Sequence, residues 1–281
     1  MPLPLINSQV SRPKIRHIIA IAAGKGGVGK STVAVNMALA LKEQGYKVGV
    51  LDADLYGPSI QKMLPCDRLP SQKGEWLFPG LAMGLKIISM AHFSEEGKAK
   101  AVRAPIANSI ITQFLERVEW EGLDFLLIDF PPGTGDIQIT LAQKAKIEGA
   151  VMVTTPQDVA GIDVLKAIDL FKAVHIPILG VIENMSYLKV EGREEPLKPF
   201  GSGGGDKIAR SAGAPLLARV PIEEAISSSC DRGVSLFTAA GAEEAKAAFL
   251  SAAKALVSIV ERSNEEGMVD FKMEWRNITH E

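Results

Sequence analysis

The feature that most constrains this chain is a glycine-rich loop, Gly24-Lys-Gly-Gly-Val-Gly-Lys-Ser31, between an apolar run and a helical segment. It matches the pattern G-x-x-x-x-G-K-[ST], in which glycines let backbone N–H groups point inward at phosphate oxygens. The run before it, residues 17–23, is rich in isoleucine, and residues 31–44 have helical spacing that stops at Gly45. A strand, a loop and a helix N-terminus in this order predict a phosphate-binding site.

Two residues at the end of this loop carry the predicted chemistry. Lys30 is expected to reach the β and γ phosphates of a nucleotide, and the Ser31 hydroxyl to bind Mg²⁺. Lys25 is a second lysine that the pattern does not require. It is either a solvated surface residue or a cation that neutralises phosphate from another direction, such as the neighbouring subunit of a dimer. The predicted nucleotide-binding residues of the loop are Gly24, Lys25, Gly26, Gly27, Val28, Gly29, Lys30, Ser31 and Thr32.

Short apolar runs alternate with longer amphipathic segments along most of the chain. The runs are nearly continuous in apolar residues, which is typical of strands buried on both faces. Their alternation with helical segments predicts an α/β fold with a doubly wound, mostly parallel sheet. We expect strands at 17–23, 47–51, 85–90, 124–128, 150–154, 178–182 and 216–220, and helices at 31–44, 106–118, 137–146, 159–174 and 242–262.

No internal repeat or linker-like segment divides the sequence, so we expect a single domain at residues 17–262 after an N-terminal extension at 1–16. Residues 65–84 and 190–205 are expected to be irregular loops. The tail at 263–281 is expected to contain a short strand, because Val269, Phe271, Met273 and Trp275 alternate with polar residues.

Composition excludes several classes of protein. Hydrophobic residues make up 47% of the 281 residues and charged residues 23%, which is typical of an ordinary globular protein. The net charge of -2 argues against a protein that coats nucleic acid. Two cysteines exclude a disulfide scaffold and favour a reducing compartment. Without a signal peptide or an apolar run of about 20 residues, we expect a cytoplasmic protein with no membrane partner.

Acidic residues follow two of the expected strands directly, at the carboxyl ends where doubly wound sheets bind ligands. Asp129 comes after the run FLLI and is the expected carboxylate that holds Mg²⁺. Asp54 is the candidate for positioning the attacking water, and Asp52 is a further candidate magnesium ligand. Either Asp52 or Asp54 is the critical member of its pair, because geometry decides such roles.

The loop GKGGVGKST with its extra Lys25 resembles the deviant Walker A class of dimeric ATPases, which includes nitrogenase iron protein, MinD and ParA. Longer strings resemble the Mrp/ApbC family from about residue 17 to about residue 237. They are DADLYGPS at 52–59, DFPPGTGD at 129–136, TTPQDVA at 154–160, ENMSY at 183–187 and FGSGGG at 200–205.

This resemblance implies a Rossmann-like P-loop NTPase fold and a homodimer that binds ATP and hydrolyses it slowly. Members of the family assemble iron–sulfur clusters and transfer them to apoproteins. By resemblance, Lys25 contacts the nucleotide across the dimer interface, and Asn184 forms a hydrogen bond with the adenine ring.

The chain departs from the family at one motif. A C-x-x-C pair that would hold a four-iron cluster across a dimer falls here on Val190 and Arg193, and neither residue can ligate iron. Cys66 and Cys230 are too far apart in the sequence to replace the pair. Two interpretations stay open: an iron–sulfur carrier, and a cluster-free ATP-dependent switch that binds a protein partner. The acidic, alanine-rich last helix does not indicate a membrane anchor.

Overall fold

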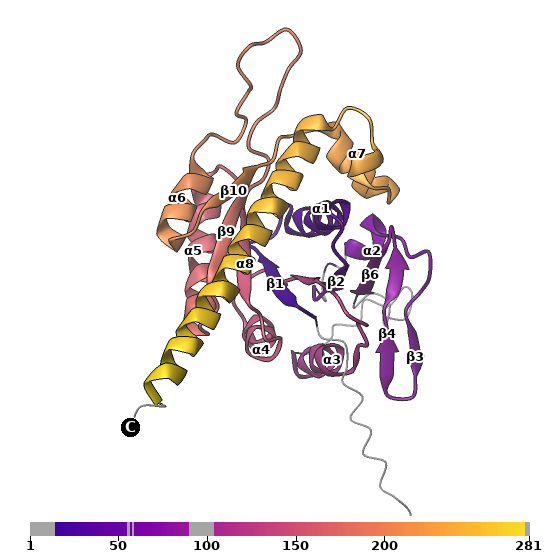
Figure 1. Cartoon of the computed structure of the whole chain (residues 1–281). Coiled ribbons are helices and arrows are strands. Elements are labelled where there is room, and N and C mark those ends of the chain that lie inside the picture. Colours follow the sequence, from indigo (N-terminus) through magenta and orange to yellow (C-terminus); the bar gives the residue numbers. More distant parts are fainter. Residues whose placement is uncertain (1–14, 55–56, 58, 90–103, 279–281) are drawn as a thin grey trace, which may run out of the picture.

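The computed structural model describes residues 15–54, 57, 59–89 and 104–278, which form a sheet covered by helices on both faces (Figure 1). The order of strands in the large sheet is β10-β9-β8-β1-β7-β2-β6-β5. Its strands are β1 (His17–Ala22), β2 (Val48–Asp52), β5 (Gly80–Ala82), β6 (Leu85–Ser89), β7 (Phe125–Asp129), β8 (Gly149–Thr154), β9 (Ile178–Glu183) and β10 (Leu216–Arg219).

Strand β1 lies in the middle of the sheet and pairs in parallel with β7 on one side and β8 on the other. All other neighbours in the large sheet are parallel as well, except β5, which runs antiparallel to β6. The predicted doubly wound, mostly parallel sheet is therefore confirmed. The strands that follow β1 in the sequence lie on both sides of it, with β2 and β7 on one side and β8 and β9 on the other. The carboxyl end of β1 is therefore at the place where such sheets bind ligands.

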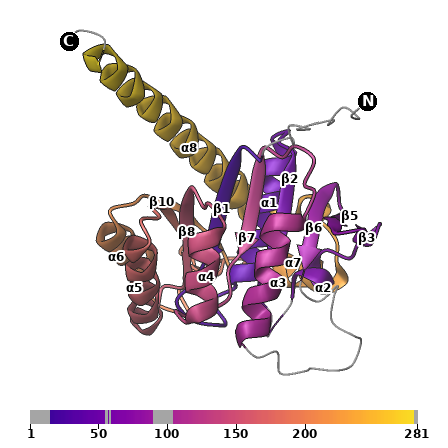
Figure 2. The ribbon, with the colours of Figure 1, turned by 90° about the horizontal axis from the view of Figure 1, so that it is seen from below.

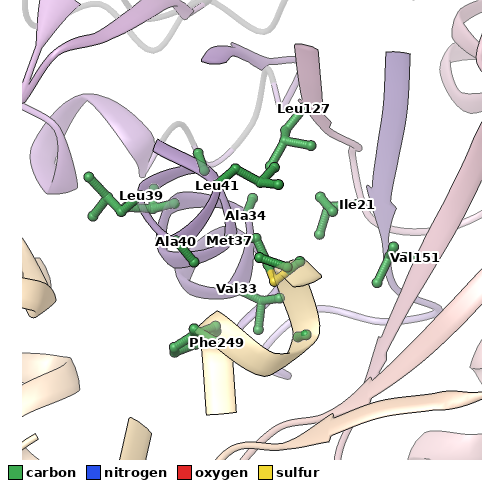
Figure 3. Close-up of a cluster of buried hydrophobic side chains, with 14 of the residues drawn as sticks. Ile21, Val33, Ala34, Met37, Leu39, Ala40, Leu41, Leu127, Val151 and Phe249 are labelled. Carbon is green, nitrogen blue, oxygen red and sulfur yellow. The ribbon is translucent and has the colours of Figure 1, made fainter. Parts of the chain in front are cut away.

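Alternate residues of β1 enter two separate cores. Ile19 and Ile21 belong to the core under α1 and α8, whereas Ala20 and Ala22 belong to the core under α3, α4 and α5. Figure 3 shows α1 packed between the sheet residues Ile21, Leu127 and Val151 and Phe249 of α8. The helices are α1 (Lys30–Glu43), α2 (Ile60–Met63), α3 (Ala104–Arg117), α4 (Asp136–Lys144), α5 (Asp158–Ala173), α6 (Gly204–Ala212), α7 (Glu224–Arg232) and α8 (Glu243–Ile278).

The expectation of an irregular loop at 65–84 was wrong. This segment holds a small antiparallel hairpin of β3 (Ser71–Lys73) and β4 (Trp76–Phe78), followed by β5 at the edge of the large sheet. Gly74, with a φ of +63°, makes the tight turn of the hairpin. The strands have only three residues each, too few for a clear alternation of polar and apolar residues.

The expectation of a strand in the tail was also wrong. Helix α8 continues without a break to Ile278, and its last part extends away from the sheet (Figure 2). In the sequence, Met268, Phe271, Trp275 and Ile278 also repeat at helical spacing, and no proline separates them from the preceding helix. Residues 1–14 of the expected N-terminal extension and Met90 of an expected strand lie outside the described residues. Within the part of the chain described, no helix has the length and apolar character needed to cross a membrane.

Candidate nucleotide site

The glycine-rich loop leaves β1 and enters α1 at the carboxyl edge of the sheet. Gly27 and Gly29 have φ values of +82° and +80°, a conformation that side chains disfavour. A Cβ atom added to Gly26 or Gly27 would meet no neighbour within 4 Å, so the loop faces open space there. At Gly24, by contrast, a Cβ atom would lie 2.0 Å from the backbone of Asp163 in α5. The loop is thus packed against α5 at its start and open at its centre.

Lys30, Ser31 and Asp129 form a connected group at the end of this loop. The Lys30 Nζ lies 2.5 Å from Asp129 Oδ1, and Ser31 Oγ donates a hydrogen bond of 2.6 Å to Asp129 Oδ2. Asp129 is fully buried and Lys30 is 7% exposed. Burial raises the pKa of the Asp129 carboxyl, and the Lys30 ammonium opposes this effect. The structure therefore joins the lysine, the hydroxyl and the acidic residue that the sequence predicted as one site.

Asp52 lies beside this group at the end of β2, which pairs with β7 so that Asp52 is opposite Asp129. Its carboxylate accepts hydrogen bonds from Ser89 Oγ at 2.8 Å and from the backbone N–H of Asp54 at 3.1 Å. Burial, and then repulsion from Asp129, raise the pKa of Asp52 to about 7. Asp54 is 9% exposed and accepts a hydrogen bond of 3.1 Å from the backbone N–H of Gly57. Asp54 is the more accessible of the two carboxylates.

Asn184, from the start of the loop after β9, closes the other side of the site. Its Nδ2 donates a hydrogen bond of 2.9 Å to the carbonyl oxygen of Val28, so it contacts the glycine-rich loop itself. A Cβ atom on Gly29 would lie 2.2 Å from this nitrogen, which explains the glycine at that position. Thr32 is turned toward α7, where its side chain hydrogen-bonds with the Cys230 thiol.

Lys25 is partly exposed at the open side of the loop. Among the residues that the structure describes, it forms no hydrogen bond or ion pair. The predicted site residues thus fall into a buried group around Asp129 and a more open side that includes Lys25, Gly26 and Gly27.

Sequence reasoning missed Ser89 and Thr155. Ser89 ends β6, next to β2, and it supports Asp52. Thr155 follows β8, and its hydroxyl is buried without a hydrogen-bond partner among the described residues. Both stand at carboxyl ends of strands, which is the pattern that also marked Asp52 and Asp129 and would have included them.

The segment that carries Val190 and Arg193 projects away from the sheet between β9 and α6 (Figure 1). Leu188 and Leu197 close its base through two backbone hydrogen bonds of 2.8 Å. Cys66 and Cys230 are both partly exposed free thiols, and burial raises the pKa of each. Among the described residues, no group of three or more His, Cys, Asp or Glu side chains is arranged to hold a metal ion.

A glycine loop between a central strand and a helix, with carboxylates at the ends of neighbouring strands, defines a P-loop nucleoside triphosphatase. The chain has this fold and this site, and it is a P-loop ATPase. Residues 14–257 match the family described as "ParA: NUBPL iron-transfer P-loop NTPase". The chain belongs to this family.

Relatives with curated names agree with the family. The chain is 44% identical over 252 residues to an "Iron-sulfur cluster carrier protein" of Aquifex aeolicus, covering 89% of this chain and 69% of that protein. It is 43% identical to the protein of the same name from Escherichia coli, over 82% of this chain and 63% of that one. The chain therefore spans about two thirds of the length of these relatives.

Solved structures place the fold in the same group. A nucleotide-binding protein from Archaeoglobus fulgidus, solved in complex with ADP, is 36% identical with a TM-score of 0.68, over 80% of this chain and 91% of that chain. The cell division ATPase MinD of Pyrococcus furiosus has a TM-score of 0.64 at 21% identity, over 87% of this chain and all of that one. At 21% identity, the similarity to this MinD protein shows a shared fold and nothing further.

Proposed function

We propose that this protein is a Mg²⁺-dependent ATPase that works as a homodimer and carries iron–sulfur clusters to apoproteins. The observation that carries the proposal is the hydrogen-bonded group of Lys30, Ser31 and Asp129 at the end of the glycine-rich loop. The cluster-carrier role is supported by the names of relatives that are 44% and 43% identical.

The side chains around Asp129 fit a magnesium ion. Ser31 supplies a hydroxyl oxygen 2.6 Å from a carboxylate oxygen of Asp129, and Mg²⁺ prefers oxygen ligands of these kinds. Asp52, whose carboxylate is held by Ser89 and the backbone of Asp54, is a further candidate for this shell. The bound ion would neutralise charge on the β and γ phosphates.

When ATP enters, the Lys30 ammonium has to exchange its partner, from the Asp129 carboxylate to the phosphates. Asp54 remains near the open side and would orient the attacking water. Asp54→Asn should therefore keep ATP binding and lose phosphate release, measured by titration with ATP and by a phosphate assay. Normal turnover in this variant would remove Asp54 from that role.

The homodimer is supported by Lys25. Its ammonium has no partner among the described residues, and it lies on the open side of the loop. If a second subunit faces this side of the loop, the Lys25 ammonium of the first subunit lies near the phosphates of the nucleotide that the second subunit binds. The positive charge would then stabilise the transferring phosphoryl group from across the interface.

The cluster is cargo in this proposal, and iron measurements test it. After anaerobic reconstitution with iron and sulfide, about four iron atoms per dimer together with absorption of visible light would support the carrier role, because a cluster held by thiolates has both properties. The chain has two cysteines, so the double variant Cys66→Ser, Cys230→Ser is the matched control and would lose any iron held by cysteine. Equal iron in parent and control would show that the iron is not held by cysteine.

A second candidate function is a cluster-free ATP-dependent switch that binds a protein partner. It is favoured by the residues at the projecting segment, where the side chains of Val190 and Arg193 cannot ligate iron. If the reconstituted parent protein contains no more iron than the control without cysteines and still hydrolyses ATP, this function is favoured over the carrier.

A further inference from the structure

The orientation of the Asn184 amide is fixed by its contact with the glycine-rich loop. The acceptor is the carbonyl of Val28, so only the NH₂ end of the amide can face it, at 2.9 Å. The amide oxygen is then the end left for a ligand, and it accepts no hydrogen bond from the described residues. An oxygen acceptor attracts the exocyclic amine of adenine and repels the carbonyl that guanine has at the same position.

Asn184 stands in a turn that needs external support. Met185, the next residue, has a φ of +54°, which is rare for a residue with a side chain. The backbone N–H of Asn184 is bonded to the carbonyl of Thr154 at 2.8 Å. The backbone N–H of Ser186 is bonded to the carbonyl of Val220 at 2.9 Å. The side chain of Glu183, the last residue of β9, adds a further contact to the turn.

The Glu183 carboxylate is 1% exposed and joins three segments. Oε1 accepts a hydrogen bond of 2.6 Å from Ser186 Oγ, which closes the turn around Asn184. Oε2 accepts one of 2.6 Å from the backbone N–H of Gly205, in the first turn of α6. The Arg219 Nε lies 3.7 Å from Oε1 and brings β10 to the same carboxylate.

The glycines at the start of α6 permit this arrangement. A Cβ atom on Gly205 would lie 2.8 Å from the Glu183 Cβ, and one on Gly204 would lie 2.4 Å from the carbonyl oxygen of Pro156. The N-terminus of a helix favours a negative charge, and here the charge is the side chain of Glu183. The glycines of the string FGSGGG at 200–205 are thus partly explained, because they let the start of α6 come close to the buried Glu183 carboxylate.

We infer that Glu183 is a positioning residue that sets the preference of the site for adenine over guanine, by holding the turn that presents the Asn184 amide oxygen. This inference rests on the proposed ATP site. Glu183 touches no nucleotide itself. Its effect passes through the Asn184 turn, so it should change the binding of the base more than the chemistry at the phosphates.

The test compares Glu183→Gln with Asp206→Asn. A glutamine keeps the shape but has one acceptor end only, so with its oxygen on the Gly205 N–H its NH₂ end has to donate to Ser186 Oγ, and the hydroxyl must turn away from the direction that it has in the parent. The glutamine also lacks the negative charge that faces Arg219. Asp206 lies in the first turn of the same helix and pairs with the same Arg219, but its carboxylate is on the surface, so it is a matched control. The measurements are dissociation constants for ATP and GTP, KM for ATP, and kcat at saturating ATP.

We expect Glu183→Gln to reduce the ratio of GTP to ATP dissociation constants about five- to tenfold, the effect of one misplaced hydrogen bond. The KM for ATP should rise with kcat nearly unchanged, and Asp206→Asn should behave like the parent. A simple loss of stability would weaken both nucleotides equally. An unchanged ratio in Glu183→Gln would overturn the inference.

Two further variants keep the result interpretable. If Glu183→Gln does not fold, Ser186→Ala removes one hydrogen bond to the same carboxylate and should lower the same ratio by a smaller factor. Asn184→Ala tests the base contact directly. An unchanged ratio in Asn184→Ala would reject the proposed adenine contact itself, whereas a change there but none in Glu183→Gln or Ser186→Ala would reject only the role of Glu183.

Discussion

At the scale of single residues, Lys30 stabilises the resting protein as well as its proposed nucleotide complex. In the structure its ammonium is the counter-ion of the fully buried Asp129 carboxylate. Removing one partner of a buried ion pair leaves an uncompensated charge, which costs about 3–5 kcal/mol. Lys30→Ala should therefore lower the free energy of unfolding in urea, and it should also abolish ATP turnover.

The control for this variant is the other lysine of the loop. Lys25 has no partner among the described residues, so Lys25→Ala should leave unfolding in urea unchanged. The double variant Lys30→Ala, Asp129→Asn should recover most of the lost stability, because it removes the buried charge. Equal stability of Lys30→Ala and the parent would contradict the buried-pair explanation.

The Asp52 carboxyl makes stability depend on pH. Its pKa in the folded chain is about 7, above the ordinary 3.8, so the folded protein binds this proton more tightly than the unfolded chain. The contribution of Asp52 to stability therefore falls as pH rises between these two values. Asp52→Asn removes the titration, and its melting temperature should exceed that of the parent by more at about pH 8 than at about pH 4. If the difference in melting temperature between Asp52→Asn and the parent is the same at both pH values, the pKa of Asp52 is not raised.

The sequence predicted the residues of this site better than their contacts. Lys30, Ser31 and Asp129 follow a spacing rule that reflects their shared chemistry, and the structure brings them together. The bond from Asn184 to Val28 joins residues 156 positions apart, and it depends on how β9 and the loop after β1 are placed by the sheet. Glu183 has the same sequence signal as Asp52 and Asp129, an acidic residue at a strand end, but this signal does not distinguish a carboxylate at the ligand site from one that holds a helix N-terminus.

At the scale of elements, the glycine-rich loop depends on α5. Gly24→Ala places a Cβ atom 2.0 Å from the backbone of Asp163, and such overpacking costs about 1–3 kcal/mol or more. Gly26→Ala meets nothing within 4 Å and has no positive φ. We expect Gly24→Ala to lower the melting temperature without nucleotide, and Gly26→Ala to keep it while weakening ATP binding. The opposite pattern would mean that the loop is not packed against α5.

Helix α8 combines a buried part and an extended part. Its residues from Ala245 to Val260 pack into the core, with Phe249 and Leu256 fully buried. The later residues continue the helix away from the sheet (Figure 2). Truncation after Glu266 should therefore leave the melting temperature of the nucleotide-free protein nearly unchanged. A drop as large as that of the control Phe249→Ala would show that the extended part packs on the domain.

The elements that the sequence predicted well are the buried ones. Long apolar runs produced the central strands within one or two residues of their observed ends. Helices α2, α6 and α7 were not predicted, since they have only 4, 9 and 9 residues, and α6 and α7 contain few large apolar residues. The tail of α8 was misassigned because four apolar residues at every second position can also be placed in a helix, and local pattern alone does not choose between the two.

At the scale of the whole molecule, the proposed dimer determines in which site each residue acts. If the dimer has two-fold symmetry, each nucleotide site contains its own Asp54 and the Lys25 of the other subunit. Lys25→Ala should then keep nucleotide binding by the monomer, and it should lower ATP-dependent dimerisation and turnover. The same variant would look inactive if Lys25 acted within its own subunit, so activity of the single variant cannot separate the two arrangements.

Mixing two inactive variants distinguishes Lys25 that acts across the interface from Lys25 that acts within its own subunit. In a dimer of one Lys25→Ala subunit and one Asp54→Asn subunit, the site on the first subunit has an intact Asp54 and receives an intact Lys25 from the second. Each mixed dimer has one complete site. If pairing were random, half of the dimers would be mixed and an equimolar mixture would recover about a quarter of the parental turnover; weaker dimerisation of Lys25→Ala changes this fraction but leaves turnover above that of either variant alone. The mixture of Lys30→Ala with Asp54→Asn is the control, because both residues act within one subunit and no complete site can form. If Lys25 acts in its own subunit, both mixtures stay inactive, and this result would reject the cross-subunit role of Lys25.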